Sequence, residues 1–212
     1  MKRLFSLFLL LMALLPLTVE ARTITDLFAS EPGNIFPLLT RTARLDMADY
    51  YNSGQKVALP NNLGGESELV MLDSTYLKVK TSGSKVVEML MRKVGKDTVI
   101  TVIETVLTPV PDSRLTQWNS HWQRYTSNKL FSMPGIEDFI VKKMSSELRA
   151  DLQDAMIFPL IQLTFEGEKH DAIKATHGLE QFLAPSEYSR FAPYLKPSLS
   201  YRFNGLKIKQ AK

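Results

Sequence analysis

The sequence predicts an α+β fold in which an antiparallel β-meander has helices packed on one side. Four segments with alternating or continuous apolar and β-branched residues follow one another with short turns between them, at residues 67–72, 76–81, 85–92 and 98–107. An apolar repeat typical of a helix precedes these segments, and another follows them. This order resembles two consecutive α-then-β units, although no sequence self-similarity supports a true repeat.

The first 21 residues have the features of a secretory signal peptide. Basic Lys2 and Arg3 are followed by an apolar run from Leu4 to Leu15, and a small-residue site ends at Ala21. The run of about 12 residues is shorter than the roughly 20 that a membrane-spanning helix needs, so a membrane anchor is the weaker interpretation. We therefore expect cleavage after Ala21, export to the periplasm or the extracellular space, and no transmembrane span in the mature chain.

The composition excludes some partners. The chain has 26 lysines and arginines against 22 aspartates and glutamates, and a formal net charge of +4. Charges of both signs alternate without a basic run, so a nucleic-acid partner is not expected. Because the sequence contains no cysteine, an exported chain of this kind is stabilised by its core rather than by disulfides, and lipid attachment through a cysteine is excluded.

One helix is predicted between the signal peptide and the meander. Asn34 is its expected N-cap, Pro37 fits its first turn, and residues 52–54 end it. Arg44 lies off the apolar stripe and is expected on the polar face. The stripe consists of Leu39, Ala43, Met47 and Tyr50. The preceding residues 22–30 are expected to form an irregular lead-in.

The part of the chain after the meander contains a second helix and further strands. Apolar residues four positions apart, from Ile136 to Leu152, predict the best helix of the chain. The expected elements are a helix at 136–156, a strand at 158–165, a strand or broken strand at 172–183, a helix at 185–192 and a hairpin at 199–209. We divide the mature chain into residues 22–130 and 131–212, and expect the two parts to pack as one globular domain.

No catalytic, cofactor or metal motif is recognisable. The sequence has no Gly-x-Ser-x-Gly, phosphate loop or dinucleotide fingerprint, and the Ser-x-x-Lys spacing at Ser82 falls in a predicted turn. His170 and Asp171, with His177, form the one histidine grouping, but its spacing is loose for a ligand set. The sequence therefore predicts no catalytic residue, no cofactor and no metal site.

An aromatic group is the one candidate for a ligand or partner surface. It consists of Trp118, His121, Trp122, Arg124 and Tyr125, which fall within eight residues and include both tryptophans. If this stretch is helical, the two indoles lie on one face and could hold a sugar ring or a peptide. The alternative is that they cover the open edge of the sheet and are buried, which is the commoner position for tryptophan.

Several phrases of the sequence together resemble a known family of exported proteins. They are residues 35–40, 44–49, 63–68, 76–79, 87–90, 111–115 with Trp122, 193–196 and 201–205. In this order they resemble the uncharacterised family known as domain of unknown function 3256. The resemblance covers most of the mature chain and implies an exported globular protein with no established activity, ligand or catalytic residue. Within it, Asp112, Ser113 and Arg114 are the most motif-like part, although a turn with a salt bridge explains them equally well.

Two classes of function are weighed against these observations, beside a third, a pure scaffold or inhibitor-like domain, which predicts neither a catalytic pocket nor exposed tryptophans. The first is a non-enzymatic binding or interaction module of the envelope, whose partner would be an envelope protein, a peptide or a glycan. The second is a hydrolase or a metal-assisted enzyme whose site is assembled from scattered residues. The absence of catalytic motifs favours the first. An enzyme would require a group such as His170 or a perturbed carboxylate to converge with others in a pocket.

Overall fold

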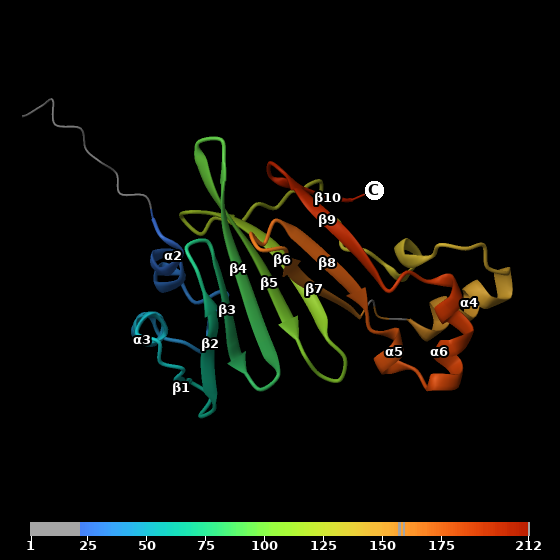
Figure 1. The fold of residues 1–212 in the computed structure, drawn as a ribbon, viewed down its shortest axis with the longest axis horizontal. Coiled ribbons are helices and arrows are strands. Elements are labelled where there is room, and N and C mark those ends of the chain that lie inside the picture. Colours follow the sequence, from blue (N-terminus) through green and yellow to red (C-terminus); the bar gives the residue numbers. More distant parts are fainter. Residues whose placement is uncertain (1–21, 157, 159, 212) are drawn as a thin grey trace, which may run out of the picture.

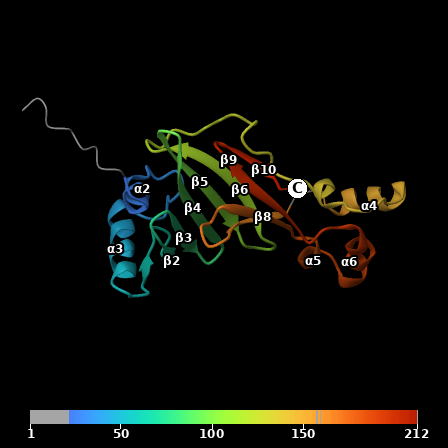
Figure 2. The same cartoon turned by 45° about the horizontal axis from the view of Figure 1, so that its top comes forward.

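A computed structural model describes residues 22–156, 158 and 160–211. The predicted signal peptide, residues 1–21, lies outside the described residues. The chain forms two antiparallel sheets, with α2 and α3 at one end of the molecule and α4, α5 and α6 at the other (Figures 1 and 2). Within the described part, none of the helices has the length and apolar character needed to cross a membrane. The predicted α+β fold is confirmed.

The first sheet is a six-stranded meander in which each strand pairs with the next along the chain. Its strands are β1 (Ala58–Pro60), β2 (Glu66–Leu72), β3 (Tyr76–Ser82), β4 (Lys85–Val94), β5 (Asp97–Val106) and β6 (Asp112–Asn119). All four predicted strands are present within two residues of their expected ends. β5 is buried on both faces, as its almost continuous apolar sequence predicts, because β4 and β6 flank it and packing covers both sides.

The helices α2 (Ile24–Ser30) and α3 (Arg41–Asn52) cover one face of this sheet. Two predictions are corrected here. Residues 22–30 are not an irregular lead-in, because Thr23 and Asp26 form a capping box that starts α2. The next helix begins at Arg41 rather than near Ile35, because Thr40 caps it by accepting a hydrogen bond from the Ala43 N–H.

Arg44, which the apolar stripe placed on the polar face of the helix, is buried. Its guanidinium donates to the carboxylate of Glu31 at 2.9 Å and to the Glu31 carbonyl oxygen at 2.7 Å. The same carboxylate accepts four backbone N–H groups, from residues 33 to 36. Glu31 therefore shapes the turn between α2 and α3, and this turn replaces the first helical turn expected at Asn34.

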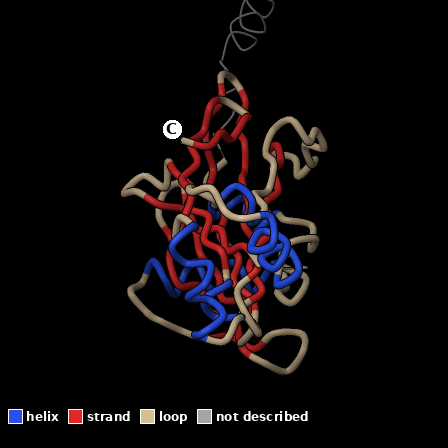
Figure 3. Tube along the Cα trace, turned by 90° about the vertical axis from the view of Figure 1, so that its right-hand side faces the viewer, coloured by secondary structure: helices blue, strands red, loops and turns tan. Residues whose placement is uncertain are grey.

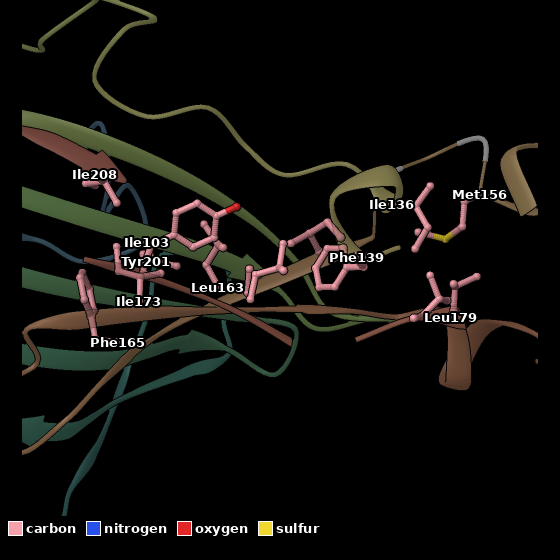
Figure 4. Packing of buried hydrophobic residues seen from close by; sticks show 14 of the residues in the cluster. Ile103, Ile136, Phe139, Met156, Leu163, Phe165, Ile173, Leu179, Tyr201 and Ile208 are labelled. Atoms are coloured by element: carbon pink, nitrogen blue, oxygen red, sulfur yellow. The ribbon is translucent and has the colours of Figure 1, made fainter. Parts of the chain in front are cut away.

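The second sheet covers the other face of the meander. Its strands have the order β10-β9-β8-β7 and are β7 (Ile161–Glu166), β8 (Ala172–His177), β9 (Ser198–Asn204) and β10 (Lys207–Gln210). The core between the sheets combines Tyr76, Leu90 and Ile103 from the meander with inward residues of the second sheet, including Leu163 and Tyr201. Figure 4 shows that this cluster continues from Ile103 and Tyr201 towards Phe139 and Leu179 at the helical end of the molecule.

The predicted helix at 136–156 is interrupted. A short 3-10 helix, η1 (Ile136–Phe139), is followed by extended backbone, and α4 (Ser146–Ala155) begins only after Ser145 caps it. The interruption has a tertiary cause, because Ile140 pairs with Leu195 and the Val141 N–H donates to the Tyr194 carbonyl at 2.9 Å.

The remaining helical elements are α5 (Leu179–Phe182), α6 (Pro185–Phe191) and η2 (Ala192–Tyr194). Figure 3 views this end of the molecule, with helices in front of the strands. The helix predicted at 185–192 and the hairpin at 199–209 are confirmed. Of the two alternatives for residues 172–183, a continuous or a broken strand, the structure has the broken one, since β8 ends at His177 and α5 follows.

Side chains of β6 join the two sheets where β6 and β7 approach each other. Asp112 accepts a hydrogen bond from the Ile161 N–H at 3.1 Å, and the Ser113 hydroxyl accepts one from the Leu163 N–H at 2.9 Å. The neighbouring Arg114 pairs with Glu104 of the same sheet. The motif-like phrase at residues 112–114 is therefore a structural connection in this fold.

Candidate functional site

Residues 124–133, which we call the strap, connect the edge of the first sheet to the second. The chain reverses direction at residues 119–123, and the Tyr125 N–H then donates to the Gln117 carbonyl of β6 at 2.9 Å. Further along, the Leu130 carbonyl accepts a hydrogen bond from the Ile208 N–H of β10 at 2.8 Å. In Figure 2 this yellow-green segment passes above β9 and β10 on its way to α4. The strap therefore runs from an edge strand of the first sheet, β6, to an edge strand of the second, β10.

A cavity of about 380 Å³ lies between β6 and the strap. This volume is within the range of small-molecule sites. Its walls are Leu115, Thr116 and Gln117 of β6 and eight strap residues, Arg124, Tyr125, Thr126, Ser127, Asn128, Leu130, Phe131 and Met133. Arg124 is the one charged side chain among these lining residues, and none of them is acidic. The cavity therefore combines apolar walls, neutral polar groups and one cation.

Gln117 is the most unusual residue of this cavity. Its side chain is only 3 % exposed, and its Nε2 has no hydrogen-bond partner among the described residues. Thr101, its cross-strand neighbour on β5, is fully buried, and its Oγ1 also lacks a partner in the described part of the chain. A buried polar group without a partner is unfavourable by about 1–3 kcal/mol. The nitrogen itself is not exposed to the cavity, so an acceptor atom of a ligand reaches it only after the amide turns about its terminal torsion.

The two tryptophans lie on the helix side of the sheet. The stretch is a strand and a turn, so the indoles do not meet through helical spacing; their rings are nevertheless in edge contact, with centroids 6.0 Å apart. Trp122, with a left-handed φ of 60°, is 8 % exposed and packs against the core beneath α2 and α3. Trp118 is half-buried and donates to the Thr116 hydroxyl. Both indoles contribute to packing, and Trp122 offers no free ring face.

The five residues of the predicted surface are thus divided between two places. Arg124 and Tyr125 line the cavity, His121 is exposed in the turn, and the tryptophans pack against the helix-side core. Sequence reasoning missed Gln117 and Phe131. Gln117 carried no recognisable signal, because the strand face that it shares with Ser113 and Leu115 is not an apolar stripe and the cavity forms only where the strap lies over it.

A second group of polar residues surrounds His170. Its Nε2 lies 3.3 Å from the carboxylate of Asp73, and its ring stacks on Tyr76 with centroids 3.7 Å apart. The other oxygen of Asp73 accepts the N–H groups of Thr75 and Tyr76. Burial would raise the pKa of Asp73, but these hydrogen bonds outweigh it and lower that pKa below its usual value. Asp73 is thus an ionised, well-oriented partner for the imidazole.

Beneath the imidazole, Tyr76 connects to a buried carboxylate. The Tyr76 hydroxyl donates to Glu88 at 2.5 Å, and Lys78 lies 3.8 Å from the same carboxylate. Burial raises the pKa of Glu88, and it raises the pKa of the Tyr76 hydroxyl as well. His170 and Asp73 also line an open groove of about 540 Å³ that Ser74, Arg92 and neighbouring residues complete.

The histidine grouping expected from the sequence does not form a ligand set. His170 contacts Asp73 rather than Asp171, whose carboxylate lies 3.8 Å from Arg202. His177 is buried against Phe139, and burial lowers its pKa. In the part of the chain that the structure describes, no three His, Cys, Asp or Glu residues are placed to hold a metal ion.

The fold and the cavity define the chain as a two-sheet α+β protein with a partly polar cavity between β6 and the strap. The family described as "Protein of unknown function (DUF3256)" matches residues 16–208, so the chain belongs to this family and the resemblance is confirmed. A solved domain of an uncharacterized protein from Porphyromonas gingivalis W83 has a TM-score of 0.77 and 22 % identity, covering 88 % of this chain and 96 % of that one. That likeness concerns the fold alone. No curated protein matches the chain.

Proposed function

We propose that the protein is exported to the periplasm or the extracellular space and acts there as a non-enzymatic binding module. Its ligand site is the cavity beneath the strap. The observation that carries this proposal is Gln117, a buried amide that lines a cavity and lacks a hydrogen-bond partner among the described residues. A ligand atom that accepts from Gln117 would remove an unfavourable feature of the free protein.

The signal-peptide features of the first 21 residues support export. The described part of the structure starts at Arg22. Its first core side chain is Ile24, and Arg22 donates to the Ser120 carbonyl at 2.6 Å. Expression of the full chain with its first 21 residues, followed by cell fractionation and N-terminal sequencing, tests this proposal: a cytoplasmic chain that keeps its first 21 residues would contradict export.

The binding function is tested by thermal melting of residues 22–212 against glycans, cell-wall peptides and divalent metals. A ligand at 100 times its dissociation constant adds about 2.7 kcal/mol to the free energy of unfolding, which gives a clear shift in Tm. We expect the shift with a glycan or a peptide to disappear in Gln117→Leu and to persist in His121→Ala. A shift that survives Gln117→Leu unchanged would place the ligand elsewhere.

A specific observation also supports the second candidate, an enzyme of the hydrolase class. His170 Nε2 lies 3.3 Å from the carboxylate of Asp73, and a carboxylate beside an imidazole can orient it as a general base. The pair lies at an open groove together with Ser74. If this candidate is correct, ester substrates should be hydrolysed by residues 22–212, and Asp73→Asn should reduce the rate by orders of magnitude while Tm changes little. An activity unaffected by Asp73→Asn would exclude this site.

A further inference from the structure

We infer that the cavity beneath the strap selects an amphipathic carboxylate, that is, a small ligand with one anionic end and a short apolar part. This inference rests on the proposed function, because it assigns a class of ligand to the same site. It follows from three features of the cavity: its charge, its hydrogen-bond donors and its apolar wall.

The charge of the cavity is positive. Arg124 is the single charged lining residue, it is exposed, and it forms no ion pair with any other described residue. An arginine guanidinium binds a carboxylate through two parallel hydrogen bonds, which makes it the preferred partner of planar anions. Because none of the lining residues is acidic, nothing in the cavity wall competes with an anionic ligand for Arg124.

The donors of the cavity complement an oxygen-rich group. Gln117 Nε2 is buried and lacks an acceptor among the described residues, and Thr126 and Ser127, which carry hydroxyls, are among the lining residues. A carboxylate offers only acceptor positions, which suits both an amide N–H and a guanidinium. A cationic ligand would instead face Arg124 without a compensating acid, which is unfavourable.

The apolar wall accounts for the rest of the ligand. Leu115, Leu130, Phe131 and Met133 line the cavity beside the polar groups. Phe131 is held in place by an edge contact with Tyr201, at 5.5 Å between ring centroids. Burial of a short aliphatic group against these side chains is favourable at about 25 cal/mol per Å². The C-terminal residue of a peptide and a medium-chain fatty acid share this chemistry.

The test compares each acid with its uncharged amide, by titration calorimetry of residues 22–212. The probes are acetyl-glycyl-leucine and its C-terminal amide, for the peptide source, and octanoate and octanamide, for the lipid source. We expect at least one acid to bind about tenfold or more tightly than its amide, since a charge-assisted hydrogen bond contributes about 1.5–3 kcal/mol. Equal binding of acid and amide, or no binding of either acid, overturns the inference.

Two variants distinguish a specific effect of the Arg124 charge on ligand binding from a general effect of the protein's net charge. Arg124→Gln should abolish the preference for the acid, whereas Lys129→Gln removes an equal charge from a strap residue outside the cavity lining and should preserve it. A preference that survives Arg124→Gln overturns the inference. The proposed binding function is tested separately from this ligand class. It stands if a neutral glycan or peptide produces a Gln117-dependent shift in Tm, even when both acids fail to bind.

Discussion

Two carboxylates of the first sheet lie in opposite electrostatic surroundings. Burial raises the pKa of Glu88 between the sheets, and the hydrogen bond from Tyr76 and the charge of Lys78 compensate only in part. Burial would also raise the pKa of Glu104, but hydrogen bonds from Lys85 and Arg114 outweigh it and hold that pKa below its usual value. The two residues should therefore affect stability with opposite dependence on pH.

We predict that Glu88→Gln stabilises the protein at neutral pH by roughly 1 kcal/mol, because the amide accepts from Tyr76 without a buried charge. A folded-state pKa above the unfolded value of about 4.5 means that the favourable contribution of Glu88 is present below that pH and is lost as pH rises through the folded pKa. Urea unfolding of wild type and variant between pH 4 and 8 measures this dependence of the free energy of unfolding on pH. The difference between variant and wild type should grow with pH.

The matched control is Glu104→Gln. The lowered pKa of Glu104 contributes stability above about pH 4.5, and this contribution is lost as pH falls through the folded pKa. The variant should therefore be less stable than wild type at pH 7, and the difference should shrink on acidification. The same sign of pH dependence in both variants would contradict the assignment of the two environments.

A further prediction concerns the buried pair of Glu31 and Arg44. Glu31→Ala should destabilise the protein by about 3–5 kcal/mol, because the Arg44 charge stays buried without a partner and the turn loses its acceptor. The control is Asp151→Ala, which removes an ion pair to Arg190 between half-exposed side chains and should change stability by at most about 1 kcal/mol. Equal effects in chemical denaturation would contradict the special role of burial.

At the scale of elements, the connection between β6 and β7 determines how the sheets meet. The Ser113 hydroxyl accepts from the buried Leu163 N–H and is hydrogen-bonded to Thr105. β6 and β7 each form an edge of their own sheet, and side chains here take the place of a backbone ladder. These hydrogen bonds therefore hold the edge of the second sheet against the edge of the first.

We predict that Ser113→Ala destabilises the protein by about 1–3 kcal/mol, because it leaves the Leu163 N–H buried without an acceptor. Hydrogen exchange should show faster exchange of the Leu163 amide. Ser200→Ala, on the exposed outer face of β9, is the control and should change stability by less than about 0.5 kcal/mol. Unchanged exchange at Leu163 would show that the hydroxyl does not hold β7 in place.

At the scale of the whole molecule, the core between the sheets links the two parts of the chain. Tyr76, Leu90 and Ile103 belong to residues 22–130, and most of the side chains that cover them belong to residues 131–212. Separation of the two parts would expose these residues to water. The protein should therefore fold as one cooperative unit.

We predict that a fragment of residues 22–130 does not form a stable domain. Its meander would keep the helix-side core but lose the cover of the second sheet. The fragment should lack a cooperative thermal transition and bind a hydrophobic dye, whereas residues 22–212 should melt in one transition. A fragment that melts cooperatively with native near-ultraviolet circular dichroism would show that the first part is an independent domain.

Structural features that depend on neighbouring residues could be predicted from the sequence, whereas features that depend on tertiary contacts could not. The strands and their turns follow from period-two alternation and short turn sequences, and the structure has them where the sequence predicts them. The helix at 136–156 was predicted from an equally regular repeat, yet Ile140 pairs with Leu195, more than fifty residues away. Of the candidate surface, Arg124 and Tyr125 line the cavity, while Trp122 is buried.

The sequence by itself determined the class of fold, the order of the meander and the family, because apolar periodicity and turn residues act within a few positions of each other. The tertiary structure alone decided which polar side chains are buried. Glu31 meets Arg44, Glu88 meets Tyr76, and Gln117 lines a cavity formed by the strap. These pairings depend on segments that come together only in the folded chain, where loss of water makes each unpaired polar group unfavourable.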